Sequence, residues 1–118
     1  MKLHLVLKSK WYDMIESGEK PEEYRAFNAY WKKRLGTHKE SEAFKKDGVA
    51  CVLYSVILPD GSLAKYWFKN FESIVFHKGY TNVTMEWKIK NALLGISLQE
   101  WGGNDEPAFI IELAERVK

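Results

Sequence analysis

Alternation of apolar and polar residues at every second position is the feature that most restricts the fold of this sequence. The pattern is clearest at 83–90 (VTMEWKIK) and recurs at 2–8 (KLHLVLK). A period of two predicts strands with one buried face. The residues expected to face inward are Val83, Met85, Trp87 and Ile89. Glu86 is then expected on the outer, polar face.

Further strands are predicted at 22–27, 49–58, 63–68, 73–78, 93–97 and 108–113. The 93–97 stretch continues the 83–90 strand after a bend. Residues 49–58 are apolar on both faces, which predicts a strand covered on two sides. The PDG tripeptide at 59–61 predicts a hairpin turn. Because short strands outnumber helices, we expect one α+β domain over 1–118. Its architecture is a small, open, mostly antiparallel β-barrel with short flanking helices.

Two short helices are predicted between the first strands. Ser9 is the expected N-cap of a helix at 10–17, with Gly18 as its C-terminal cap. The side chains expected to share its buried face are Trp11, Met14 and Ile15. Asn28 is the expected N-cap of a second helix at 29–35. The charged segment 37–47 is a candidate insertion or lid, either a solvated helix or a mobile surface stretch.

Composition narrows the function classes. A formal net charge of +2 argues against a protein that holds a long duplex through its phosphates. The single cysteine, Cys51, cannot form an internal disulfide, and its apolar surroundings predict a buried, inert thiol. No disulfide-linked partner is expected. No apolar stretch reaches the ~20 residues that span a bilayer, and the first residues lack a signal-peptide pattern. We therefore expect a cytoplasmic protein that does not bind membranes.

Most catalytic and metal-binding motifs are absent. The sequence contains no G-x-S-x-G, P-loop or G-x-G-x-x-G motif. Its three histidines, His4, His38 and His77, are widely separated and lack the spacing of metal ligands. Neither a metal nor a cofactor is predicted.

The stretch at 17–25 (SGEKPEEYR) is the strongest functional candidate. Lys20 and Glu23 would point to opposite faces of a regular strand, but a bend at Pro21 would bring them to one side. A partly desolvated lysine held by a carboxylate can carry protons or anchor phosphate. Arg25 can present a planar fork to a phosphate or a base edge. A salt-bridged surface turn explains the same residues, so pattern alone leaves both readings open.

The run G18-E19-K20-P21-E22-E23-Y24-R25 resembles the G-x-K-x-x-E-x-R signature of the ASCH domain, a β-barrel family related to the PUA domain. The first strand and helix, the AYWKKRL stretch at 29–35 and the FHKGY and EWGG segments at 76–80 and 100–103 resemble small members of phage type. The resemblance is weakest over 37–68.

The resemblance implies a cleft lined by Lys20, Glu23 and Arg25 that binds RNA or nucleotides. One group of the family removes the acyl group from acetylated cytidine with a lysine in the position that Lys20 matches. That group has threonine at the position of Glu23, which puts the same chemistry in doubt for this chain. Other members are described as ribonucleases. It stays open whether this chain is an enzyme. If it is one, it would be an amidohydrolase or a ribonuclease with Lys20 and Glu23 as catalytic residues.

Four further residues are candidates for nucleic-acid binding. Arg34 and Trp31 are neighbours on the second predicted helix, where Arg34 could hold a phosphate and Trp31 could stack on a base. Tyr80 follows Gly79 at a strand end, where it could stack on a base or plug the barrel. Trp101 lies beside Gly102 and Gly103 in a loop, where it could cover a ligand or close the core. Packing on the barrel also explains Trp31.

The leading hypothesis is a module that recognises a single-stranded or modified nucleotide at the barrel mouth. The alternatives are a small hydrolase of acylated nucleosides or RNA and a protein-interaction adaptor. The sequence names neither the ligand nor the oligomeric state.

Overall fold

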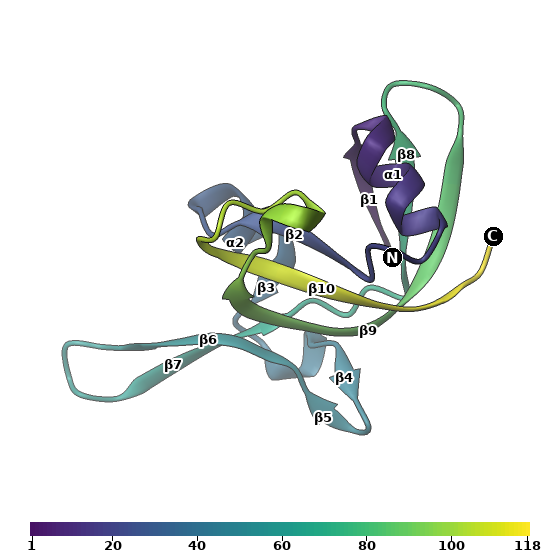
Figure 1. The fold of residues 1–118 in the computed structure, drawn as a ribbon. Helices are drawn as coiled ribbons and strands as arrows, with labels where there is room; N and C mark the ends of the chain where they lie inside the picture. Colours follow the sequence, from purple (N-terminus) through teal and green to yellow (C-terminus); the bar gives the residue numbers. More distant parts are fainter.

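A curved five-stranded sheet forms the body of the molecule in the computed structural model, which describes residues 1–118 (Figure 1). Its strands, in spatial order, are β1 (Lys2–Leu7), β8 (Ser73–Lys78), β9 (Thr84–Ile96), β10 (Pro107–Arg116) and β2 (Glu22–Ala26). The β1–β8 pair is parallel and the other three pairs are antiparallel. The predicted α+β class and the open, mostly antiparallel sheet are confirmed.

Strand β9 gives the sheet its curvature. Its first residues pair with β8 and the rest pair with β10, so one long strand turns from one half of the sheet into the other. The β9–β10 register shifts on both sides of Leu113. Such irregularities bend a strand and increase its twist. The result is the half-barrel in Figure 1, with the predicted 93–97 continuation as the second half of β9.

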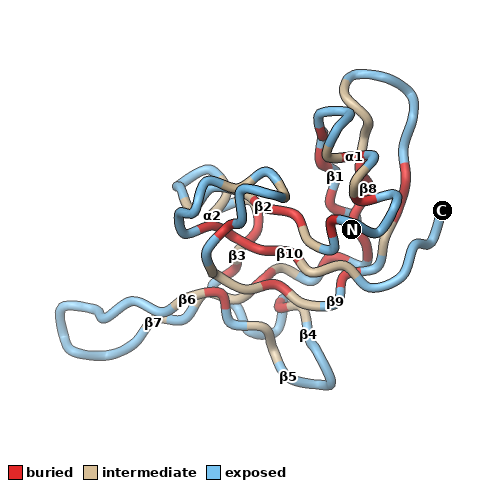
Figure 2. The backbone as a smooth tube through the Cα atoms, viewed as in Figure 1, coloured by how far each residue is buried: buried red, intermediate tan, exposed pale blue.

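The core lies on the concave side of this sheet. Leu3, Leu5 and Leu7 of β1 are buried, and the residues between them are exposed, as alternation predicts. Helix α1 (Ser9–Glu16) covers this part of the core with Tyr12 and Ile15 (Figure 2). No helix is long and apolar enough to cross a membrane.

Helix α1 differs from its prediction at the start and on its buried face. It begins at Ser9 and not after it, since Lys8 holds the N-cap position without a side-chain cap. Tyr12, and not Trp11 or Met14, packs beside Ile15. Tyr12 and Ile15 are three residues apart and therefore neighbours on one face. Gly18 follows the helix at φ +85°, a left-handed conformation that glycine adopts without strain.

Helix α2 (Ala29–Leu35) is confirmed together with its N-cap, because the Trp31 N–H donates to Asn28 Oδ1 at 3.0 Å. The segment after it forms no solvated helix. It contains β3 (Gly36–Thr37), a 3-10 turn η1 (Glu40–Glu42), β4 (Lys45–Lys46) and β5 (Val49–Ala50). Ala43 is buried and the Phe44 N–H donates to the Phe68 carbonyl, so backbone pairing fixes the segment against the body.

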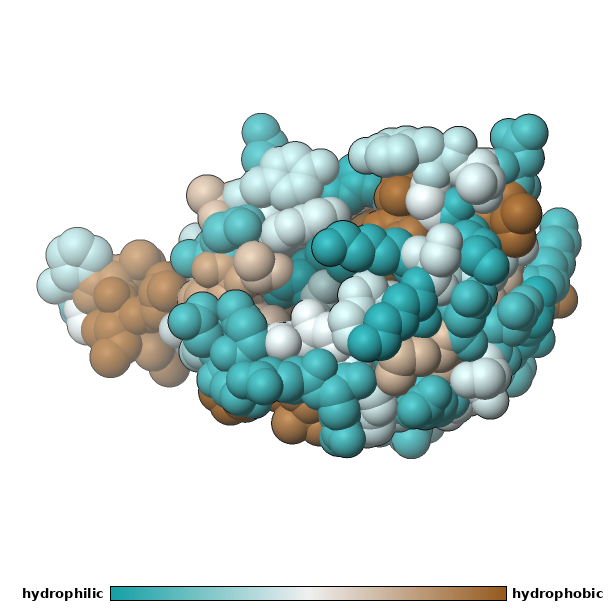
Figure 3. Space-filling model, turned by 45° about the horizontal axis from the view of Figure 1, so that its top comes forward, coloured by the Kyte–Doolittle hydropathy of each residue, from teal (hydrophilic) through white to brown (hydrophobic).

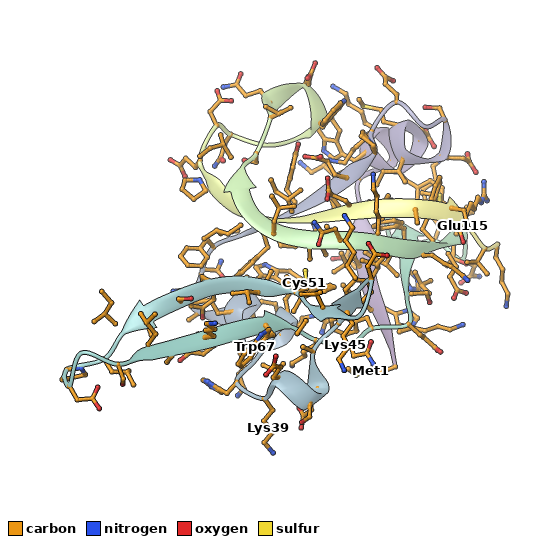
Figure 4. The ribbon with its side chains drawn as sticks, turned by 90° about the horizontal axis from the view of Figure 1, so that it is seen from below. Met1, Lys39, Lys45, Cys51, Trp67 and Glu115 are labelled. Atoms are coloured by element: carbon orange, nitrogen blue, oxygen red, sulfur yellow. The ribbon has the colours of Figure 1, made fainter.

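A second sheet, β3-β7-β6, extends away from the body as a hairpin of β6 (Val52–Ile57) and β7 (Leu63–Phe68), here called the arm. Figures 1 and 4 show it projecting sideways. Apolar side chains gather on its tip (Figure 3). The prediction of a strand covered on two sides is wrong, since Ile57 is 76% exposed and Leu53 is the only buried residue of β6.

Three other burial predictions fail. Val83 is exposed because it lies in the turn before β9. Glu86 is buried, because Ser73 Oγ donates to its Oε2 at 2.5 Å and Lys2 Nζ lies 3.1 Å away. These contacts, that of Ser73 first, lower the pKa of Glu86. Cys51 is only half-buried, and its Sγ donates to the Ala92 carbonyl where β6 passes under β9 (Figure 4).

Candidate functional site

The segment between α1 and β2 places the first charged residue of the candidate site. Once α1 has ended, the Lys20 N–H donates to the Met14 carbonyl at 3.0 Å. The Leu113 N–H of β10 then donates to the Pro21 carbonyl at 3.0 Å. The chain is thus held at both sides of Pro21, and Lys20 turns inward immediately before β2 begins.

Lys20 is a fully buried lysine, only 1% exposed. Its Nζ lies 3.3 Å from Glu23 Oε1 and donates to the Trp101 carbonyl. The rings of Tyr24 and Trp11 flank the ammonium at 4.7 and 5.4 Å. Burial lowers the pKa of Lys20, and it outweighs Glu23, whose charge and hydrogen bond raise it.

Glu23 joins two cations. Its Oε1 faces Lys20 and accepts the Tyr24 N–H at 2.8 Å, while its Oε2 lies 3.1 Å from Arg25 Nη1. Arg25 also donates from Nη1 to the Tyr24 carbonyl and from Nη2 to the Val6 carbonyl of β1 at 3.4 Å. One carboxylate therefore orients an ammonium and a guanidinium, an arrangement called the Lys20 site from here on.

Three hollows meet at Arg25. The first, about 210 Å³, contains the Lys20 site and is closed by Trp11, Trp101 and Gly102. The second, about 330 Å³, lies between Phe27 and the loop at 102–108. The third, about 490 Å³, is lined by His4, Leu5, Val6, Tyr30, Trp31 and Arg34 as well as Arg25. Arg25 is the one residue that borders all three, and the three hollows together are called the depression from here on.

Trp31 and Arg34 both belong to the third hollow. The guanidinium carbons of Arg25 and Arg34 lie 5.2 and 5.8 Å from the Trp31 ring. Arg34 Nη2 also donates to the His4 carbonyl at 3.0 Å. Trp31 packs against the core and edge-on against Tyr30 as well. The predicted Trp31–Arg34 neighbourhood is present, and Trp31 takes part in both the packing and the hollow.

Trp101 reaches the site through its backbone. It ends the 3-10 turn η2 (Gln99–Trp101), and its carbonyl accepts from Lys20. The following loop turns back tightly, since a Cβ at Gly103 would lie 2.4 Å from Ser97 Cβ. The Trp101 side chain packs beside the cluster that contains Tyr24.

Tyr80 does not belong to this depression. It is fully exposed in the turn between β8 and β9 and lines none of the three hollows. Its exposure excludes the role of a barrel plug. Glu86 contacts Lys2 and Ser73 and lines none of the three hollows.

Sequence reasoning missed two rings of the site, those of Tyr24 and Trp11. Tyr24 is buried, and its hydroxyl donates to Glu22 Oε2 at 2.7 Å. Burial, followed by this hydrogen bond, raises the pKa of Tyr24. Its position inside the 18–25 motif was the available signal. Trp11 was assigned to the core face of α1, and no local pattern indicates that it turns toward Lys20.

No group of three or more His, Cys, Asp or Glu side chains is arranged to hold a metal ion. Comparisons with protein-family models, curated proteins and solved structures find no match to the chain. The case for a function therefore depends on the geometry of the site and on the motif that the sequence carries.

Proposed function

We propose that this chain is an ASCH-like, PUA-related domain that recognises a single-stranded or modified ribonucleotide in the cytoplasm. The observation that carries the proposal is the Lys20 site, a buried ammonium, carboxylate and guanidinium at the meeting point of three hollows. Burying the charges of Lys20 and Glu23, with Arg25 partly exposed beside them, costs free energy. A surface turn would not need this arrangement, whereas a preorganised binding site would.

The chemistry of the site suits a nucleotide. Arg25 offers planar donors to a phosphate or a base edge, and Lys20 offers an ammonium to a carbonyl oxygen. Glu23 can accept from an exocyclic amino group. Aromatic side chains such as Trp31 and Tyr30 line the neighbouring hollow, where a base can stack. A pocket of this kind needs little overall positive charge, in agreement with a net charge of +2.

The depression is also large enough. Ligand pockets of proteins usually measure about 300–1,000 Å³. The first hollow alone is smaller, at about 210 Å³, but it adjoins hollows of about 330 and 490 Å³. The second and third hollows therefore each lie within this range.

Incubation with a panel of nucleosides, acetylated cytidine and short single-stranded RNAs tests the proposal. Thermal stabilisation is read together with mass spectrometry of the ligands. We expect stabilisation by at least one ligand, its loss in Lys20→Met and its retention in Lys65→Met, which removes an exposed lysine of the arm. Stabilisation by no ligand would overturn the proposal and leave the apolar arm, and with it the adaptor role, as the functional surface.

The lowered pKa of Lys20 favours one second candidate, a small hydrolase. A lysine that releases its proton more readily than usual can act as a general base toward a water molecule, with Glu23 holding it in place. The same mass spectra separate the candidates. A deacylated or cleaved product that Lys20→Met no longer forms supports the hydrolase, and unchanged ligand supports recognition alone.

A further inference from the structure

Two histidines far apart in the sequence meet on the convex face of the sheet. The parallel pairing of β1 with β8 places His4 and His77 on the same outer face. His4 Nδ1 and His77 Nε2 lie 2.9 Å apart, and the ring centroids lie 5.2 Å apart. Two neutral imidazoles at this distance share one N–H between the two nitrogens, so the pair acts as a unit.

His4 is the member of this pair that lines the third hollow, whose charged lining is entirely basic. The ionisable groups around the hollow include His4, Arg25 and Arg34, and no carboxylate lines it. Arg34 Nη2 donates to the His4 carbonyl, which fixes the guanidinium beside the imidazole. The Arg34 Nε is buried without a partner. An anion is the ligand that complements such a surface.

The third hollow also adjoins the hollow that contains the Lys20 site. Both hollows are bordered by Val6 and Arg25, so a chain lying in one leads directly into the other. A nucleotide whose base occupies the Lys20 site would therefore place a neighbouring backbone phosphate in the third hollow.

We infer that His4 and Arg34 form a phosphate site for single-stranded RNA, and that His4, with His77 as its hydrogen-bond partner, takes up a proton when a backbone phosphodiester binds there. This inference rests on the proposed function, because it assigns a second subsite to the same ligand.

The charges around the pair set the sign of this coupling. The groups that face it are Arg34 and Tyr30 from α2, Arg25 from β2, and Lys2 and Glu86 on the same face of the sheet. Lys2 and Glu86 neutralise each other at 3.1 Å. Arg25 is likewise paired with Glu23 at 3.1 Å, which leaves Arg34 as the unpaired cation beside His4. A bound phosphate adds a negative charge next to the pair, and a nearby negative charge favours a protonated imidazole. Imidazole generally changes charge between pH 5 and 8, so the coupling acts in this range.

Fluorescence anisotropy with labelled single-stranded RNA without terminal phosphates tests the coupling. Phosphodiesters keep their charge from pH 5.5 to 8, so a change in affinity reports on the protein. We expect the affinity of the unmodified chain to fall about fivefold or more between pH 6 and 8. At pH 8, His77→Gln should bind the RNA with the same affinity as the unmodified chain. Between pH 6 and 8 the affinity of this variant should stay constant.

His38 supplies the matched control. Its ring packs on Tyr66 of the arm at 4.4 Å, outside the hollow. His38→Gln should keep the full pH dependence. Equal pH dependence in His77→Gln and the unmodified chain would overturn the inference.

A second probe separates this inference from the proposed function. In NMR spectra, inorganic phosphate should move the imidazole signals of His4 and His77 and leave those of His38 unchanged. If no RNA binds at any pH but phosphate moves both signals, the phosphate site stands and the proposed function fails. If RNA binds but neither RNA nor phosphate moves these signals, the proposed function stands and the histidine site is wrong.

Discussion

The 18–25 segment and the arm reverse the usual relation between hydropathy and burial. In the 18–25 segment, Lys20 and Glu23 are 1% and 4% exposed. In the arm, Ile57 and Leu63 are 76% and 61% exposed. Figures 2 and 3 show the contrast, with buried chain in the body and hydrophobic residues gathered on the projecting tip.

The difference teaches that partners, and not hydropathy alone, decide which side chains this fold covers. Lys20 has a carboxylate, a carbonyl and two aromatic rings within contact distance. Ile57 has only Leu63 opposite it across the hairpin. A charge with enough partners tolerates burial. An apolar residue at the end of a two-stranded hairpin stays exposed because no second layer covers it.

Glu23→Gln should have the largest effect on the 18–25 segment. It leaves a buried ammonium and a nearby guanidinium without their shared carboxylate. Removing one partner of a buried pair costs about 3–5 kcal/mol of unfolding free energy. Urea denaturation measures this loss.

The matched control is Glu115→Gln, whose exposed carboxylate lies 3.8 Å from Lys88 (Figure 4). It should change the unfolding free energy by less than about 1 kcal/mol. Equal effects of the two variants would mean that Glu23 is not part of a buried pair in solution.

Gly103→Ala should have the next largest effect. The added methyl group would lie 2.4 Å from Ser97 Cβ, so the loop that carries the Trp101 carbonyl must move. Overpacking of this kind costs about 1–3 kcal/mol. We expect a loss of stability and weaker RNA binding together. A variant with unchanged stability and affinity would show that this loop does not hold Lys20.

A smaller effect, confined to alkaline pH, follows from the lowered pKa of Lys20. Between this lowered pKa and the ordinary 10.5, the unfolded chain binds more protons at Lys20 than the folded chain does. The unfolding free energy attributable to Lys20 therefore rises with pH in this window. Denaturation of the unmodified chain and of Lys20→Met at pH 8–10 measures it. The unfolding free energy of the unmodified chain, minus that of Lys20→Met, should rise with pH. A constant difference would contradict the lowered pKa of Lys20.

The smallest effects are expected for the exposed residues of the arm. Ile57→Ser and Leu63→Ser remove exposed side chains and should change the unfolding free energy by less than about 0.5 kcal/mol. Leu53→Ala, on the same strand but buried, should cost about 2–5 kcal/mol. A large loss in the exposed variants would reveal that something covers the arm in solution.

Local patterns predicted the elements of the fold well. Alternation located β1 and the first part of β9, and the Asn28 cap and Gly18 located the helix ends. Burial was harder, because it depends on what lies opposite in space. Apolar residues at 49–58 look the same whether or not a second layer covers them, and Glu86 gives no local sign of Ser73 beside it.

In the candidate site, too, local patterns predicted some contacts and missed those between residues far apart in the sequence. The 18–25 motif located Lys20, Glu23 and Arg25, and a single segment brings them together. The His4–His77 pair joins residues 73 positions apart, and only the parallel pairing of β1 with β8 reveals it. Tyr80 lies near a predicted strand end, but its turn projects away from the three hollows.

Mapping of RNA contacts by NMR tests the central claim most directly. Isotope-labelled protein is titrated with short single-stranded RNA, and the backbone and tryptophan indole signals are followed. The largest shifts should fall on residues 20–25 and 101–103 and on the indole of Trp31, with the arm unchanged. Shifts confined to the arm at 52–68, with the signals of Lys20, Glu23 and Arg25 unmoved, would contradict the account.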